Sequence, residues 1–342
     1  MTRKASSKIA VAAIVGCLVP GIAASGASAA GTLTGAGSTL VAPLEALWAQ
    51  DFQSKYGDAV TYAAVGSGAG IAQISARTVD FGASDAPMTP AQAEGCKSCV
   101  QIPWALTATG IAFHVEGVSS LKLTGQVLAE IYMGNIKTWN DPRIAKLNKG
   151  EKLPSTAITP VFRSDGSGDT YAFTDYLSRV DSSWKSKVGN ATTVSFPTGV
   201  GGKGNDGVTA VVSSTNGAIG YISASYILAH KLPAAELRNA AGKYEFPNLR
   251  NIESAASLVK KVPANNEMHI VDPSKKAKIA YPLSTFTYAI VPTSAPQKQL
   301  LASWIYYAAT AGQKFGAALD FAPIPKVVLK ATVNTIKALQ QG

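Results

Sequence analysis

The chain has 342 residues, of which 46% are hydrophobic and 15% charged, and its formal net charge at pH 7 is +10. A chain of this length suggests about two domains, each able to bury a sizeable core. No stretch dense in Lys and Arg alternates with aromatic residues, which argues against a nucleic-acid-binding protein. The diffuse positive charge is compatible with attraction of anions and equally with ordinary solubility.

The first thirty residues have the features of a signal peptide. Three cations stand before an apolar run at 9–19, and Ala27-Ser28-Ala29 forms a small-residue cleavage site. The apolar run is too short to span a membrane. We therefore expect residues 1–30 to be removed on export to the periplasm or cell envelope, which takes away three cations and no anions and lowers +10 to +7. A lipid anchor at Cys17 is the alternative, although the residues before it match a lipoprotein cleavage sequence only loosely.

From residue 32 onward, strand-like and helix-like runs alternate, which predicts an α/β fold. Three glycine-containing loops each join a strand-like run to a helix-like run. They are Gly-Ala-Gly-Ser-Thr-Leu at 35–40, Val-Gly-Ser-Gly-Ala-Gly at 65–70 and Arg-Ser-Asp-Gly-Ser-Gly-Asp-Thr at 163–170. A further segment, Asp-Phe-Gly-Ala-Ser-Asp-Ala-Pro at 80–87, places a carboxylate at a predicted strand end.

These junctions predict an anion-binding site. The first turn of a helix leaves backbone N–H groups unpaired, and its dipole favours negative charge. Glycine lets that backbone approach a ligand closely, and the arginine at 163 suits a tetrahedral oxyanion. The segment 163–170 alone is equally compatible with an N-capped surface turn, but three junctions that converge on one anion make a sharper hypothesis.

Cys96 and Cys99 are the cysteines of the mature chain. In an oxidising compartment we expect them to form a short-loop disulfide. A Cys-x-x-Cys redox motif is the alternative, but residues 100–103 read as the entry of a strand rather than of a helix. The three histidines, His114, His230 and His269, stand far apart, so we expect no zinc site. We expect no metal and no cofactor.

Five motifs in order carry a family resemblance: the glycine loops at 35–39, 66–70 and 163–168, the acidic segment 80–87, and Gly-Val-Gly-Gly-Lys-Gly-Asn-Asp-Gly at 199–207. With this order and spacing, the chain closely resembles the periplasmic phosphate-binding proteins that serve high-affinity phosphate ABC transporters. The segments 217–221 and 281–286 fit the same pattern, and the resemblance spans about residues 32–325.

The resemblance implies a monomeric binding protein rather than an enzyme. It would capture inorganic phosphate and deliver it to the membrane permease subunits of an ABC transporter. The alternatives are a binding protein of the same fold for another oxyanion and a phosphate-ester hydrolase of a related type. The chain contains no Gly-x-Ser-x-Gly elbow, which argues against the hydrolase.

The resemblance also implies a two-lobe, type II periplasmic-binding-protein fold with the ligand between the lobes. The chain would cross the hinge near 106–110 and near 282–287. Lobe 1 would then comprise residues 31–108 and 284–342, and lobe 2 residues 109–283.

Carried over position by position, the resemblance implies a phosphate site with contributions from both lobes. The implied contacts are Thr39, Leu40, Ser67, Asp85, Arg163, Ser167, Gly168 and Asp169, supported by Ser38 and by Asp165, which would orient the arginine. Asp85 would discriminate between anions, because hydrogen phosphate can donate its proton to a carboxylate whereas sulfate has none to donate.

At one position of the implied site, the chain departs from the family. The family commonly has threonine where this chain has Asp169, so the hydroxyl donor is lost and a second carboxylate arrives. We expect this carboxylate to turn away from the ligand, for example toward a lysine.

Residues 199–204 match a dinucleotide-binding pattern by their letters, but no acidic residue stands about 20 positions later. We expect them to form a hinge-side loop.

Overall fold

The computed structural model describes residues 30–341. Residues 1–29 of the predicted signal peptide, Cys17 among them, lie outside the described residues. Residues 31–342 form one compact unit. Within the described part of the chain, no helix is both long enough and apolar enough to cross a bilayer.

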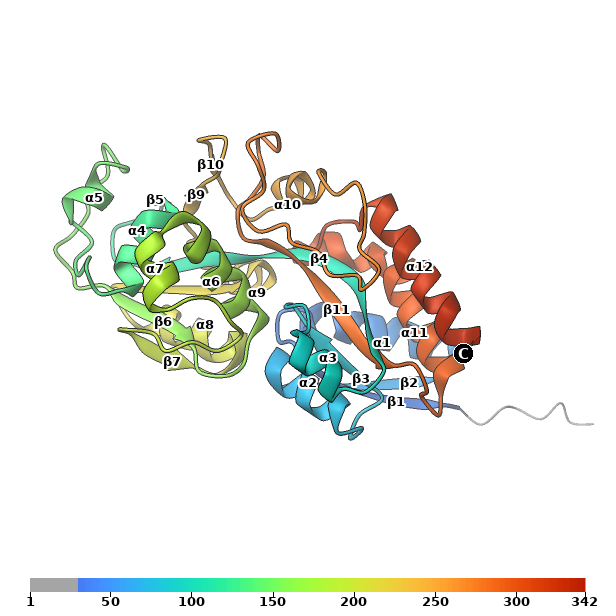
Figure 1. The fold of residues 1–342 in the computed structure, drawn as a ribbon. Coiled ribbons are helices and arrows are strands. Elements are labelled where there is room, and N and C mark those ends of the chain that lie inside the picture. The colour runs from blue at the N-terminus through green and yellow to red at the C-terminus, as the bar shows by residue number, and fades with distance from the viewer. Residues whose placement is uncertain (1–29, 342) are drawn as a thin grey trace, which may run out of the picture. The chain divides into compact units, whose positions relative to one another are not determined.

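Strands and helices alternate along the chain, as predicted (Figure 1). The strands are β1 (Thr32–Gly37), β2 (Ala59–Ala64), β3 (Phe81–Ser84), β4 (Cys99–His114), β5 (Lys122–Leu123), β6 (Thr159–Arg163), β7 (Val200–Gly202), β8 (Ala218–Ser223), β9 (Glu236–Arg238), β10 (Tyr244–Glu245) and β11 (Ser284–Pro292). The helices are α1 (Ala42–Tyr56), α2 (Ser67–Ser75), α3 (Pro90–Gly95), α4 (Gly125–Tyr132), α5 (Pro142–Ala145), α6 (Gly168–Val180), α7 (Ser182–Lys187), α8 (Gly204–Ser214), α9 (Ala224–His230), α10 (Leu249–Ala256), α11 (Lys298–Ala309) and α12 (Lys326–Gln341), with a 3-10 helix at Ala311–Leu319.

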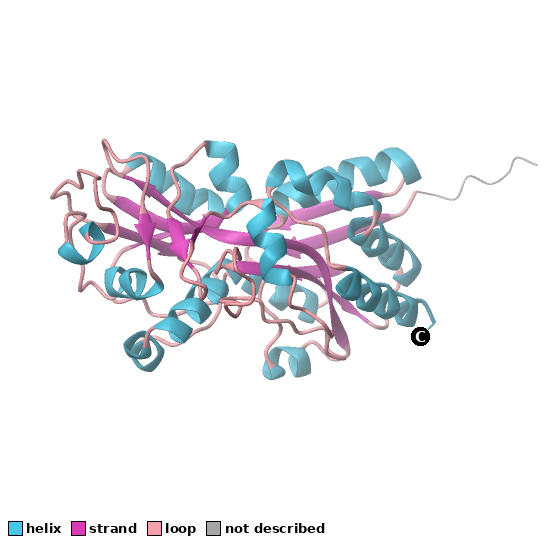
Figure 2. Cartoon of the chain, turned by 90° about the horizontal axis from the view of Figure 1, so that it is seen from above, coloured by secondary structure: helices cyan, strands magenta, loops and turns pink. Residues whose placement is uncertain are grey.

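Eight strands form one sheet in the order β2-β1-β3-β11-β4-β8-β6-β7, and β10-β9-β5 form a small second sheet. Figure 2 shows the strands running through the middle of the unit with helices on either side. The long strand β4 joins two parts of the large sheet. It pairs antiparallel with β11 from Cys99 to Ala108 and then antiparallel with β8 from Thr109 to His114. We call β2-β1-β3-β11 the first half-sheet and β8-β6-β7 the second half-sheet. The strands β1, β2 and β3 run parallel to one another, and so do β6, β7 and β8.

An aromatic core lies beside each half-sheet, and the core beside the second extends across β4 to β11 of the first. Beside the first half-sheet, Trp48 of α1 packs edge-on against Trp104 of β4 with ring centroids 5.3 Å apart. Beside the second, Phe173 of α6 stacks on Tyr221 of β8 with centroids 4.4 Å apart. The Tyr221 hydroxyl accepts a hydrogen bond from the backbone N–H of Arg163 at 3.0 Å. The second core therefore fixes the end of β6.

The strand–glycine–helix junctions predicted at 35–40, 65–70 and 163–170 are confirmed, since they join β1 to α1, β2 to α2 and β6 to α6. Ser167 is the N-cap of α6, and its Oγ accepts from the Thr170 N–H at 3.2 Å. Such a side-chain cap satisfies one of the unpaired amides that begin a helix.

The expectation of a hinge-side loop at 199–204 is wrong. Val200–Gly202 is strand β7 at the edge of the sheet, and α8 begins at Gly204, so this segment is a fourth strand–glycine–helix junction. A side chain at Gly202 would lie 2.6 Å from the backbone of Gly207. The glycines here allow close packing of strand on helix, although their composition alone suggests a loop.

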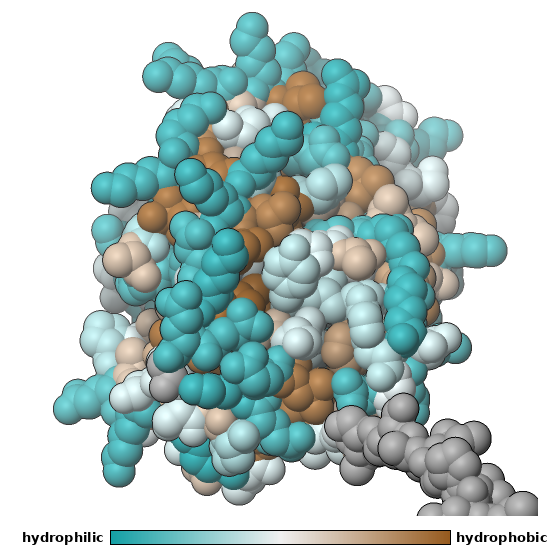
Figure 3. All heavy atoms as spheres, turned by 90° about the vertical axis from the view of Figure 1, so that its right-hand side faces the viewer, coloured by the Kyte–Doolittle hydropathy of each residue, from teal (hydrophilic) through white to brown (hydrophobic). Residues whose placement is uncertain are grey.

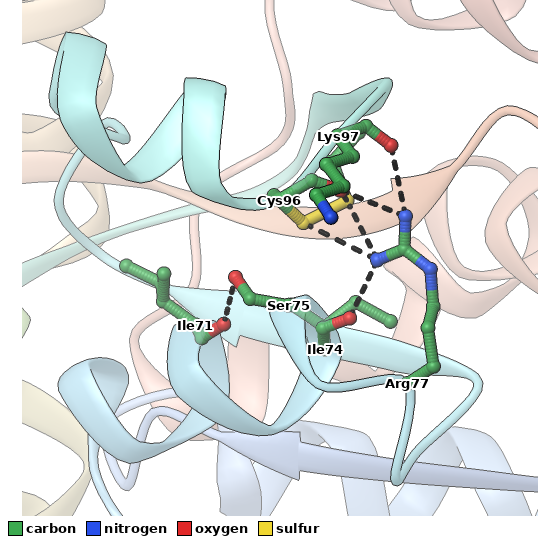
Figure 4. The surroundings of a disulfide bond; sticks show 7 residues. Ile71, Ile74, Ser75, Arg77, Cys96 and Lys97 are labelled. Carbon is green, nitrogen blue, oxygen red and sulfur yellow. Dashed lines mark hydrogen bonds between the residues drawn. A yellow bond between two sulfur atoms is a disulfide. The ribbon is translucent and has the colours of Figure 1, made fainter.

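The structure joins Cys96 and Cys99 in a disulfide, and β4 begins at Cys99 (Figure 4). The Arg77 guanidinium donates to the carbonyls of Ile74 at 2.6 Å, Cys96 at 2.7 Å and Lys97 at 2.9 Å. Arg77 thereby ties the end of α2 to the disulfide loop.

On the face in Figure 3, hydrophilic side chains cover much of the surface, and apolar side chains show only in small areas between them. This pattern is usual for a folded unit in contact with water.

Candidate anion-binding site

The sequence-predicted residues come together where four strands end. Ser38 and Thr39 follow β1, Ser67 opens α2, and Asp85 follows β3. From the second half-sheet, Arg163 ends β6 and residues 167–169 open α6. The side chains that converge here are all at most 4% exposed: Ser38, Thr39, Ser67, Asp85, Arg163, Ser167 and Asp169.

Direct contacts join the two half-sheets at this point. The Gly168 N–H donates to Ser67 Oγ at 3.1 Å, and the Gly68 N–H donates to the carbonyl of Gly166 at 2.9 Å. A Cβ atom at Gly168 would collide with the side chain of Asp85. Glycine at 168 therefore lets the start of α6 approach the acidic loop after β3.

Asp85 is a buried carboxyl group, 2% exposed. Ser38 Oγ lies 2.6 Å from both of its oxygens, and Ser67 Oγ lies 3.4 Å from Oδ2. Burial raises the pKa of Asp85 to about 7, and the charge of Asp169 adds to this effect, while Ser38 and Arg163 act in the opposite direction. Asp85 can therefore accept a proton at a pH close to neutrality.

Arg163 lies between two carboxylates. Asp165 binds it in a fork, with Nε to Oδ1 at 2.8 Å and Nη2 to Oδ2 at 2.5 Å, and Nη1 donates to Asp169 Oδ2 at 2.8 Å. Burial acts to raise the pKa of Asp165, but the bonds from Arg163 outweigh it and the net shift is downward. A guanidinium has five N–H donors. These contacts use three of them and leave two for other partners.

The carboxylate of Asp169 turns inward to Arg163, not to a lysine as suggested above. Its Oδ1 accepts from Thr109 Oγ1 at 2.7 Å, and its Oδ2 accepts from Asn205 Nδ2 at 2.8 Å in addition to Arg163. The reason is geometric, because the first turn of α6 places residue 169 beside the end of β6. Burial raises the pKa of Asp169, although Arg163, Thr109 and Asn205 oppose the shift.

The remaining predicted donors have partners within the protein. The Leu40 N–H donates to Ser38 Oγ at 3.0 Å, so Leu40 would have to leave that bond to reach an anion. Thr39 Oγ1 accepts from the backbone N–H of Asn205 at 3.2 Å and from its Nδ2 at 2.8 Å. Among the described residues, no cluster of three or more His, Cys, Asp or Glu side chains is arranged to hold a metal ion.

Sequence reasoning missed two side chains of this cluster, Thr109 and Asn205. Asn205 belongs to the motif at 199–207, and treating that motif as a fourth strand–glycine–helix junction would have found it. Thr109 lies within the long strand β4 and carries no local signal.

Comparison with known proteins identifies the family. The model of the PBP superfamily domain matches residues 23–311. The phosphate-binding protein PstS of Pasteurella multocida (strain Pm70) is 37% identical over 304 residues, which cover 87% of this chain and 88% of the relative. That of Haemophilus influenzae (strain ATCC 51907 / DSM 11121 / KW20 / Rd) is 36% identical, with 90% and 92% covered. The chain belongs to the PstS family of phosphate-binding proteins.

Solved structures support the PstS fold. A high-affinity periplasmic phosphate-binding protein bound with phosphate superimposes with a TM-score of 0.71 at 23% identity, covering 89% of this chain and 93% of that one. The phosphate-binding protein of Stenotrophomonas maltophilia gives a TM-score of 0.68 at 18% identity, covering 89% and 94%. The predicted α/β, type II periplasmic-binding-protein fold is confirmed.

Proposed function

We propose that this PstS-family chain captures inorganic phosphate outside the cytoplasm and delivers it to the permease subunits of an ABC transporter. The observation that carries the proposal is the joint burial of Arg163 and Asp85 at the openings of α2 and α6. One side chain supplies fixed positive charge and the other accepts a proton. That combination fits an oxyanion that carries a proton of its own.

The proposed ligand contacts are Thr39, Leu40, Ser67, Asp85, Arg163, Ser167, Gly168 and Asp169, with Ser38 and Asp165 in support. Most of these donors are hydroxyl groups and backbone amides. Those bonded within the protein, such as the N–H groups of Leu40 and Gly168, would exchange these bonds for the anion. Asp169 contributes its N–H, because its carboxylate is occupied by Arg163, Thr109 and Asn205.

We assign residues 31–108 and 284–342 to lobe 1 and residues 109–283 to lobe 2. The support is that β4 changes partner between Ala108 and Thr109 and that β11 begins to pair at Ser284. The Trp48–Trp104 pair lies within lobe 1 and the Phe173–Tyr221 pair within lobe 2, which agrees with this division. The anion would bind between the lobes, and their closure would bury it.

We further propose that the protein acts as an exported monomer and has no enzymatic activity. The relatives are binding proteins by name. Removal of residues 1–30 by signal peptidase would release it into the periplasm or cell envelope, and a lipid anchor at Cys17 is the alternative.

Specificity would depend on whether the anion carries a proton that it can donate to Asp85. With Asp85 ionised, hydrogen phosphate donates its O–H to the carboxylate. Sulfate would place an oxygen without a proton against a buried carboxylate, and an unpaired buried acceptor costs about 1–3 kcal/mol or more.

Calorimetric titration of the mature chain with phosphate, arsenate and sulfate tests the proposal. Above neutral pH we expect one phosphate per chain, weaker binding of arsenate, which shares phosphate's geometry and protons, and no measurable sulfate binding. Equal affinity for phosphate and sulfate would refute the proposed specificity, and absence of phosphate binding would refute the function.

A further inference from the structure

Asn205 is a fully buried amide in the first turn of α8. Its Nδ2 donates to Thr39 Oγ1 and to Asp169 Oδ2, each at 2.8 Å. Its backbone N–H donates to Thr39 Oγ1 at 3.2 Å, and its Oδ1 accepts from the Ser223 N–H at 2.7 Å. Buried amides are costly unless they are paired, and in Asn205 both side-chain donors and the carbonyl oxygen have partners.

These bonds reach both halves of the sheet. Thr39 follows β1 of the first half-sheet, whereas Asp169 and Ser223 belong to α6 and β8 on the second. Asn205 therefore connects the loop after β1 to the start of α6 through one amide group. Its bonds to Thr39 can exist only while the two half-sheets are in contact at this point.

The contact also sets the direction of the Thr39 hydroxyl. A hydroxyl group has two lone pairs and one proton. Thr39 Oγ1 accepts twice from Asn205, so both lone pairs are used. The hydroxyl proton must then be donated in another direction, which makes Thr39 a donor for an anion in the site.

The same amide restrains Asp169. Together with Thr109 and Arg163, Asn205 supplies three donors to the two carboxylate oxygens. A carboxylate held by three donors has less negative potential to present to an arriving anion. Loss of the Asn205 donor would leave Asp169 freer to turn toward the ligand.

We propose that Asn205 is a positioning residue that holds the two lobes together over bound phosphate and orients the Thr39 hydroxyl as a donor. The proposal rests on the proposed function of phosphate capture. Since the bonds from Asn205 to Thr39 form only on closure, their loss should raise the release rate of the anion more than it changes the association rate.

The experiment measures release of labelled phosphate into an excess of unlabelled phosphate, together with equilibrium affinity. For Asn205→Ala we expect release about ten- to a hundredfold faster. The association rate, obtained from the two measurements, should change far less. Asn205→Leu is uncharged and fills a similar volume but loses both Nδ2 donations, so it should also release phosphate faster and guards against misfolding caused by the cavity in the alanine variant.

Asn239→Ala is the matched control. Asn239 is another buried amide, whose Nδ2 bonds the carbonyls of Lys278 and Ala280 and whose Oδ1 accepts from Ala241 and Lys243, away from the site. It should leave the release rate unchanged. The double variant combines Asn205→Ala with Thr39→Val. Its release rate should rise by less than the product of the two single increases, because both changes break the same contact.

Release at the wild-type rate from both Asn205 variants would overturn the inference, and so would an equal acceleration in Asn239→Ala. Either result leaves phosphate capture itself intact. Failure of the unmodified chain to bind phosphate would instead remove the proposed function on which the inference rests.

Discussion

At the scale of single residues, Arg163 is the cation of the proposed contact set. Arg163→Ala should weaken phosphate binding by at least about a hundredfold, because it removes the fork of donors and leaves Asp165 and Asp169 without their cation. Arg163→Lys should recover little, since an ammonium group cannot reproduce the planar fork. Calorimetry at fixed pH and salt measures both variants.

The matched control is Arg143→Ala, which removes an exposed arginine that pairs with Asp141 and Glu130. It should bind phosphate as the unmodified chain does. Near-native affinity in Arg163→Ala would show that the site is misplaced.

Asp169→Thr should bind phosphate more tightly, by a few-fold to about a hundredfold. The change removes a carboxylate near the dianion, frees one Nη1 donation of Arg163 and adds a hydroxyl donor. Two unit charges about 5 Å apart repel by roughly 3 kcal/mol at an effective dielectric constant near 20. Weaker binding in this variant would mean that the Asp169 carboxylate is itself a ligand of the anion.

The raised pKa of Asp85 predicts that selectivity for phosphate over sulfate depends on pH. Burial and the charge of Asp169 raise its pKa to about 7, so the carboxyl group is ionised above this pH and protonated below it. A protonated Asp85 can donate to an oxyanion that has no proton. Sulfate binding should therefore emerge as the pH falls through about 7 and be lost as it rises, as calorimetry across that range would measure.

The control is Asp85→Asn, whose amide can donate at every pH. Sulfate binding to this variant should not depend on ionisation at position 85. If the unmodified chain rejected sulfate equally on both sides of neutrality, Asp85 would not be the discriminating group.

At the scale of elements, α1 carries a buried group that the site does not use. Both carboxyl oxygens of Glu45 are buried and have no hydrogen-bond partner among the described residues. Burial raises the pKa of Glu45 from 4.5 to about 8. Between these values the folded chain holds a proton that the unfolded chain has lost, so this group destabilises the fold progressively as pH rises from 4.5 to about 8.

Glu45→Met, which keeps the length of the side chain without its polar atoms, should remove this dependence. Its free energy of unfolding near pH 8 should exceed that of the unmodified chain by on the order of 5 kcal/mol, at about 1.4 kcal/mol per unit of pKa. Denaturant unfolding at several pH values measures the difference. Glu94→Met on the exposed surface of α3 is the control, and an identical pH slope in Glu45→Met and the unmodified chain would contradict the prediction.

At the scale of the whole molecule, closure of the proposed lobes should accompany phosphate binding. The contacts that join the two half-sheets, from Gly68 to Gly166 and from Gly168 to Ser67, lie at the site itself. An anion that binds both sides should therefore favour the closed arrangement. We expect small-angle scattering to show a smaller radius of gyration with phosphate than without it.

Arg163→Ala should show no such change at the same phosphate concentration. A radius that is independent of phosphate in the unmodified chain would contradict closure, while leaving phosphate binding to be judged by calorimetry.

Much of the fold was predictable because its signals are local. The alternation of strand and helix, the Ser167 cap and the junctions at 35–40, 65–70 and 163–170 depend on residues close together in the chain. The glycines of segment 199–204 suggest a loop, so the prediction from the sequence was wrong there. Pairing with β6 and close packing of Gly202 against Gly207 make Val200–Gly202 a strand.

The sequence by itself determined the α/β class, the family resemblance and the residue types of an oxyanion site, since glycine turns, helix starts and a fixed arginine act over a few residues. The tertiary structure alone decided the contacts that carry no local signal. Thr109 and Asn205 reach Asp169 across 60 and 36 positions, and Asn205 reaches Thr39 across 166. Such pairings depend on how the sheet brings distant strand ends together, and so does the burial that moves the pKa of Asp85 toward neutrality.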